Sequence, residues 1–210
     1  MQAVDVDRSD FHFIERVDRS NDPRRTVEVV RNLMSAPCHV VAHSYGAIAA
    51  LMLAERHPNL VRGLVLFEPA TPALARGRSS VEAHIAAMTP VFMRCEDSTI
   101  SDATFAEMFL LAMGVEPKGT AEQLEAEGEL LRAIVPPWKF ELDPTVPSRT
   151  PTLIVTGAGD PMYGEIAEAI AEEGAEHVEL EGTGHRPQDD RRATEHMKDF
   201  WIRSVTQRVT

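Results

Sequence analysis

The sequence predicts an α/β fold, in which helices flank a mostly parallel sheet. Short apolar runs alternate with segments of helical period near both ends of the 210-residue chain. The apolar run Cys38–Ala42 passes through a sharp turn directly into a small-residue helix over residues 47–54. Residues 71–150 contain helical patterns but no clear strand. We therefore expect a core built from two parts, residues 1–70 and 151–210, with a helical insertion between them.

The first part of the core should contain three strands and two helices. Ala3–Val6 is the first expected strand, followed by a polar, irregular segment. Residues 25–34 carry apolar side chains at helical spacing. The helix after the sharp turn should stop near Pro58, because proline cannot continue a helix. Residues 61–68 form a second apolar strand that Pro69 closes.

The later elements follow from the same two periodicities. In the middle segment, helical spacing predicts three helices, which carry Val81–Met88, Phe105–Met113 and Leu124–Ile134. The second part of the core should contain a strand at 152–155, a helix that carries Ile166 and Ile170 and ends near Gly174, and a short strand at 177–181. The closing helix is expected to present one apolar face, formed by Ala193, Met197, Phe200, Trp201 and Val205.

Composition restricts the kinds of partner and compartment. The formal net charge is −12, which argues against nucleic acid and anionic membranes as partners. The two cysteines, Cys38 and Cys95, lack metal-site spacing and indicate a reducing compartment, with Cys38 expected as a small core residue. The N-terminus resembles no signal peptide, and no apolar run approaches the roughly 20 residues of a membrane span. We therefore expect a cytoplasmic protein.

The turn after Cys38–Ala42 places Ser44 at its apex. A serine on a sharp strand-to-helix turn exposes its hydroxyl, and the helix that follows favours negative charge beside it. The pattern G-x-S-x-G is met except at its first position, where Ala42 is also small. Ser44 is therefore a candidate nucleophile.

Two further polar groups lie where a strand of the expected sheet ends. Asp160 follows the strand at 152–155, and His185 follows the strand at 177–181. Sites in open parallel sheets gather beyond the carboxyl ends of the strands. A serine needs a base to take its proton, and a carboxylate can hold the imidazole of that base in the right tautomer. The order Ser44, Asp160, His185 therefore predicts nucleophile, orienting acid and general base.

With these motifs the chain resembles the α/β-hydrolase superfamily. The resemblance rests on His43-Ser44-Tyr45-Gly46, on residues 156–160 around the acid, on residues 182–185 around the histidine, and on the strand ending Leu66-Phe67-Glu68-Pro69. It implies that residues 71–150 form a helical cap. It also implies a serine hydrolase of the carboxylic ester type, without cofactor or metal, that acts on a small or medium ester, thioester or related acyl compound.

The resemblance also suggests roles for residues around the serine. The amide of Tyr45 would donate to the oxyanion, and His43 would contact the substrate. Apolar cap residues are expected to line the substrate pocket, namely Met88, Phe92, Met93, Met108, Phe109 and Met113.

One departure from the family pattern concerns the beginning of the chain. Members usually have about four strands before the nucleophile, whereas 43 residues precede Ser44 here. A His-Gly loop that supplies a second oxyanion donor is also not found. Losing one such donor typically costs about 10²–10³ in rate. We therefore expect an N-terminally truncated fold whose strand Cys38–Ala42 needs a partner, from Ala3–Asp7 or from a second copy in a homodimer.

The sequence allows four alternative interpretations. Gly157-x-Gly159 suggests a dinucleotide site, but the third glycine position is Met162. His39 and His43 suggest a zinc site, but the sequence offers no third ligand near them. Glu68 also ends a strand and is an alternative acid, less favoured than Asp160. A non-catalytic binding or scaffold protein that retains these residues as relics is the alternative to an enzyme.

Overall fold

The computed structural model describes residues 12, 14 and 21–206, with side chains up to residue 204. The strand expected at Ala3–Val6 lies outside the described residues. The described strands form one parallel sheet in the order β1-β2-β3-β4, which confirms the predicted fold class. Their bounds are Cys38–His43 for β1, Val61–Phe67 for β2, Thr152–Thr156 for β3 and Glu176–Glu179 for β4.

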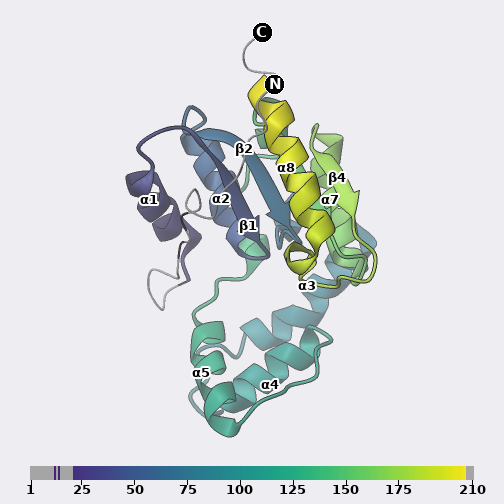
Figure 1. Ribbon diagram of the computed structural model, residues 1–210. Coiled ribbons are helices and arrows are strands. Elements are labelled where there is room, and N and C mark those ends of the chain that lie inside the picture. Colours follow the sequence, from purple (N-terminus) through teal and green to yellow (C-terminus); the bar gives the residue numbers. More distant parts are fainter. Residues whose placement is uncertain (1–11, 13, 15–20, 207–210) are drawn as a thin grey trace.

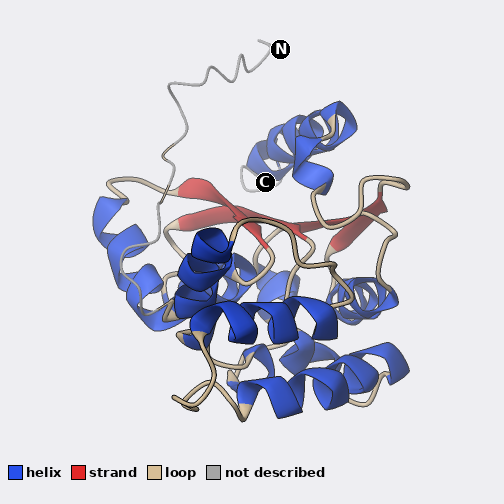
Figure 2. Ribbon diagram, turned by 90° about the horizontal axis from the view of Figure 1, so that it is seen from below, coloured by secondary structure: helices blue, strands red, loops and turns tan. Residues whose placement is uncertain are grey.

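The core helices lie on both faces of this sheet, which Figures 1 and 2 show as a layer between helices. On one face, α1 packs against α2, and α7 covers the same face over β3 and β4. On the other face, α8 packs against β2 and β3. The bounds are Pro23–Leu33 for α1, Gly46–Arg56 for α2, Pro161–Glu172 for α7 and Arg191–Thr206 for α8.

Alternation along the central strands explains why both faces are covered. In β2, Leu64 and Leu66 pack toward α2, whereas Val65 and Phe67 pack toward α8. Successive side chains of a strand point to opposite faces, so a strand that is apolar throughout can be buried only between two layers. The predicted apolar face of α8 is confirmed for Ala193, Met197, Phe200 and Trp201.

The first strand of the described sheet lies at its edge and is less covered than its apolar sequence indicates. Cys38 is exposed, and Val41 on the α8 side of the sheet retains 41% of its surface. Among the described strands, β1 has a neighbour on one side only, because it pairs with β2 alone. The expectation that Cys38 is a core residue was therefore wrong.

The middle segment, residues 71–150, contains helices and turns and no strand, as predicted. Residues 79–132 of this segment lie below the sheet in Figure 1, on the side toward which β1 and β2 point. Its elements are η2 (Pro72–Ala75), α3 (Ser79–Phe92), α4 (Asp102–Ala112), α5 (Ala121–Arg132), η3 (Pro137–Lys139) and α6 (Val146–Arg149). We call this stretch the helical segment.

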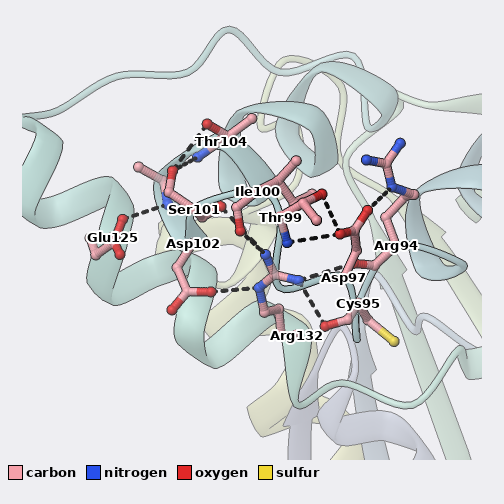
Figure 3. Close-up of polar contacts among 11 residues, drawn as sticks. Arg94, Cys95, Asp97, Thr99, Ile100, Ser101, Asp102, Thr104, Glu125 and Arg132 are labelled. Carbon is pink, nitrogen blue, oxygen red and sulfur yellow. Dashed lines mark hydrogen bonds and ion pairs between the residues drawn. The ribbon is translucent and has the colours of Figure 1, made fainter.

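Helices α4 and α5 pack closely because Gly128 presents no side chain at their crossing. A Cβ at Gly128 would lie 1.9 Å from the carbonyl oxygen of Asp102, so any larger residue would push the helices apart. This approach brings Arg132, at the end of α5, beside the loop that joins α3 to α4 (Figure 3).

All three guanidinium nitrogens of Arg132 bind groups of that loop or of the residue that begins α4. Nη1 donates to the carbonyls of Arg94 and Cys95 at 3.0 and 2.8 Å, and Nη2 donates to Ile100 at 2.9 Å. Nε forms an ion pair with Asp102. Carbonyl groups of a loop that has no secondary structure of its own thus gain charged hydrogen-bond donors.

We predict that Arg132→Met lowers the free energy of unfolding by about 1–3 kcal/mol, because several carbonyls and Asp102 lose a charged donor. Chemical denaturation monitored by circular dichroism measures the change. The matched control is Arg191→Met, whose ion pair with Glu195 is formed by a side chain that is 87% exposed, so a change within about 0.5 kcal/mol is expected. Equal stability of Arg132→Met and wild type would contradict the prediction.

Candidate active site

Ser44 lies directly after β1, on a turn that neighbouring backbone groups hold in place. Its amide donates to the carbonyl of Phe67 at 2.9 Å, and its own carbonyl accepts from Ala47 and Ala70 at 3.1 Å each. Helix α2 begins at Gly46, and its residues from Ala47 to Ala54 are all buried. The buried helix and the end of β2 therefore fix the position of the serine.

Of the four described non-glycine residues with positive φ, three lie at this edge of the sheet. Ser44, Glu68 and Ala158 have φ values of 51°, 45° and 56°, and each follows a strand within two residues. Such a conformation costs about 1–3 kcal/mol for a residue with a side chain, and it persists where the surrounding structure enforces it. The strained residues therefore mark the carboxyl ends of β1, β2 and β3 as the candidate site.

His185 lies in the loop after β4 and reaches back to the end of β2. Its Nδ1 lies 3.4 Å from Oε2 of Glu68, whose side chain is 2% exposed, whereas the imidazole side chain is 45% exposed. The carboxylate oxygen must accept, so Nδ1 carries the proton and Nε2 is left as the basic nitrogen. Hydrogen bonds of this kind are often long before a substrate is bound.

The loops after β3 and β4 touch through two glycines. A Cβ at Gly157 would lie 1.8 Å from the carbonyl oxygen of Gly184, so Gly157 leaves the room in which the histidine loop packs. The amide of Gly157 donates to Oε1 of Glu68 at 2.6 Å. Glu68 therefore holds both loops, one through each carboxylate oxygen.

Asp160, the acid predicted from the sequence, caps the N-terminus of α7. Its Oδ1 accepts from the amide of Met162 at 2.9 Å, and its charge also acts on His84 of α3. The structure gives Asp160 no hydrogen bond to His185 among the described contacts. The role of Asp160 as the orienting acid stays a prediction.

His43 precedes the serine and joins the nucleophile turn to the histidine loop. Its Nε2 donates to the carbonyl of His185 at 2.7 Å, and the two imidazole rings lie 4.7 Å apart. Burial lowers the pKa of His43, so the neutral form is favoured. The predicted contact of His43 with substrate stays a prediction.

Tyr163, on the first turn of α7, is a site residue that the sequence did not reveal. Its ring lies 4.9 Å from that of His185, and the side chain is 4% exposed. Burial raises the pKa of this phenol well above its ordinary value, and a hydrogen bond with Ser44 acts in the opposite direction. Tyr163 shares the helical spacing of Ile166 and Ile170, so in the sequence it looks like one more core position.

Tyr45 links the nucleophile turn to the helical segment. Its hydroxyl donates to the carbonyl of Val135 at 3.1 Å, and its ring lies edge-on to Phe140 at 6.2 Å. The predicted role of its amide as an oxyanion donor stays a prediction.

The apolar residues predicted to line a pocket occupy different environments in α3 and α4. Met88 and Phe92 are buried, Met93 is 78% exposed, and Met108, Phe109 and Met113 are partly buried. Phe92 packs edge-on against both Phe109 and Trp138, at 5.6 and 5.2 Å between ring centroids. Their contact with a substrate stays a prediction, and the exposure of Met93 makes that residue the weakest candidate of the six.

Comparison with known proteins gives a family and a set of similar folds. The profile described as "Alpha/beta hydrolase family" matches residues 6–196. No curated protein matches the sequence. A structure from a study of carboxylesterases of the thaumarchaeon Nitrososphaera gargenis is similar at a TM-score of 0.62 and 13% identity, over 91% of this chain and 75% of the other.

Two further structures share the fold at low sequence identity. The hydrolase olei00960 from Oleispira antarctica gives a TM-score of 0.58 at 13% identity, over 92% of this chain and 76% of the other. CarC, a serine hydrolase involved in carbazole degradation, gives a TM-score of 0.51 at 15% identity, over 92% of this chain and 74% of the other. In the part of the chain that the structure describes, no helix is both long and apolar enough to span a membrane.

Three partly buried histidines make stability depend on pH. Burial lowers the pKa of His43, His84 and His177 below the ordinary histidine value of about 6.5. Below that value the unfolded chain binds more protons than the folded chain, so acid favours unfolding.

We predict that the melting temperature falls as the pH decreases from 7.5 to 5.5, measured by differential scanning calorimetry. His84→Gln, which removes one titrating group, should reduce the size of this decrease. A melting temperature that rises over the same interval would contradict the sign.

Proposed function

Because the chain belongs to the alpha/beta hydrolase family, we propose that it is a serine hydrolase of small or medium acyl compounds such as esters and thioesters. The observation that carries the proposal is that the left-handed Ser44 lies at the same edge of the sheet as His185, whose Nδ1 faces a buried carboxylate and whose ring lies 4.7 Å from that of His43. The similarity to structures of carboxylesterases and other hydrolases agrees with this class of reaction.

In the proposed reaction, Nε2 of His185 takes the hydroxyl proton of Ser44 while the serine oxygen attacks the acyl carbon. The amide of Tyr45 and the dipole of α2 stabilise the oxyanion that forms. Collapse of this intermediate expels the alcohol or thiol, which receives the proton from His185. Water then attacks the acyl-serine by the same route and releases the acid.

The third group of the proposed site is a carboxylate that holds Nδ1–H of His185. The sequence pattern favoured Asp160, and Glu68 was the alternative. Either side chain would stabilise the imidazolium that forms during the reaction.

We predict that a fluorophosphonate probe labels the wild-type protein and does not label Ser44→Ala, because the probe bonds to an activated serine oxygen. Gel fluorescence after timed incubation measures the labelling. Ser148→Ala, which changes an exposed serine of α6 whose hydroxyl donates to Thr145, is the matched control and should be labelled as wild type.

A screen of short acyl esters of p-nitrophenol completes this test. Turnover that is lost in both Ser44→Ala and His185→Ala supports the proposal. Equal labelling of wild type and Ser44→Ala would refute the nucleophile. Absence of both labelling and turnover in the folded wild type would favour the non-catalytic alternative.

We predict that Tyr163→Phe lowers kcat about fivefold with little change in KM. Phenylalanine keeps the ring against His185 but removes the hydroxyl that holds Ser44, and one lost hydrogen bond corresponds to roughly 1 kcal/mol. Steady-state kinetics on the best ester of the screen measures the effect. Unchanged kcat would show that the Ser44–Tyr163 contact has no part in turnover.

A further inference from the structure

We infer that Glu68, rather than Asp160, is the carboxylate that positions His185. The inference rests on the proposed function and assigns the third group of that site. It starts from the contact already described, in which Oε2 of Glu68 lies 3.4 Å from Nδ1 of His185.

Glu68 is held in this position by its backbone as well as by its side chain. Its amide donates to the carbonyl of Val155 at 3.0 Å, and its φ of 45° turns the chain sharply at the end of β2. Its other oxygen, Oε1, accepts from the amide of Gly157. A carboxylate with one oxygen fixed can present the second oxygen in a single direction, toward the imidazole.

The strand that ends before Glu68, β2, is also hydrogen-bonded to the turn that carries Ser44. In the parallel register, His43 lies opposite Phe67, so Ser44 and Glu68 leave the sheet side by side. The hydrogen bond from the Ser44 amide to the Phe67 carbonyl, and that from the Ala70 amide to the Ser44 carbonyl, tie the two turns together. The distance between serine and carboxylate therefore depends on one strand pair and not on a long loop.

Asp160 has a structural role of its own. It is the N-cap of α7, and one of its oxygens is already bonded to the amide of Met162. A capping side chain typically contributes about 1 kcal/mol to stability, and asparagine caps about as well as aspartate. The N-cap role is thus a sufficient reason for an aspartate at position 160.

Glu68→Gln keeps one of the two hydrogen bonds of the Glu68 side chain and changes the other. The amide oxygen of glutamine can still accept from Gly157, so the contact with the acid turn is kept. The amide nitrogen then faces Nδ1 of His185 and can only donate. The imidazole must therefore carry its proton on Nε2, where it cannot accept the proton of Ser44.

The experiment compares Glu68→Gln with Asp160→Asn, which keeps the N-cap. We expect Glu68→Gln to lower the rate of fluorophosphonate labelling and kcat by about 10²–10⁴-fold, as loss of the orienting carboxylate does in serine hydrolases. Asp160→Asn should remain within about threefold of wild type. Thermal unfolding of both variants verifies that they fold.

A second readout does not require activity. Nitrogen-15 NMR of the histidine rings reports which nitrogen of His185 carries the proton. We expect the Nδ1–H form in wild type and Asp160→Asn, and the Nε2–H form in Glu68→Gln.

Three results would overturn the inference: a large loss of activity in Asp160→Asn, wild-type activity in Glu68→Gln, or an unchanged His185 tautomer in Glu68→Gln. If Glu68→Gln does not fold, Asp160→Asn alone still decides, since the inference requires it to be active. Failure of the proposed function appears differently, as an inactive wild type in which the NMR readout still identifies the partner of His185.

Discussion

The buried side chain of Glu68 is the constraint on which the arrangement of the site depends. A carboxylate that is 2% exposed has lost its water and must be satisfied by the protein, here by the Gly157 amide and the His185 imidazole. These two partners come from the loops after β3 and β4, whereas Glu68 itself ends β2. One desolvated group therefore requires three strand ends to meet, and the turn of Ser44 is bonded to the same strand.

The family fold places polar groups at this edge, but local backbone geometry determines which of them meet. Positive φ at Ser44 and Glu68 turns each side chain away from its strand, and Gly157 leaves room for the chain at Gly184. The site is thus built from backbone approach as much as from side-chain chemistry. A side chain at Gly157 would separate the two loops and leave the carboxylate without one or both partners.

Sequence patterns predicted the described strands and helices of the core because burial in a layered fold imposes strict periodicity. The position of Ser44 followed from the same patterns, since a buried strand and a small-residue helix enclose it. The open side of the strand Cys38–Ala42 was expected from the family pattern and not from the strand itself, because the number of neighbours that a strand has is not recorded in its own residues. The choice between Asp160 and Glu68 depends on the path of the histidine loop, which the residues near each carboxylate do not indicate. Tyr163 has the spacing of an ordinary core residue, so its place beside His185 leaves no signal in the sequence either.

The two tryptophans of the chain lie in different layers of the molecule. Trp138 packs against Phe92 in the helical segment, whereas Trp201 of α8 lies 5.6 Å from the ring of His39 on the sheet. Each part therefore contains its own intrinsic fluorophore. Replacing one tryptophan at a time gives proteins whose emission reports separately on the helical segment and on the core, so loosening of one part can be distinguished from unfolding of the whole without any added dye.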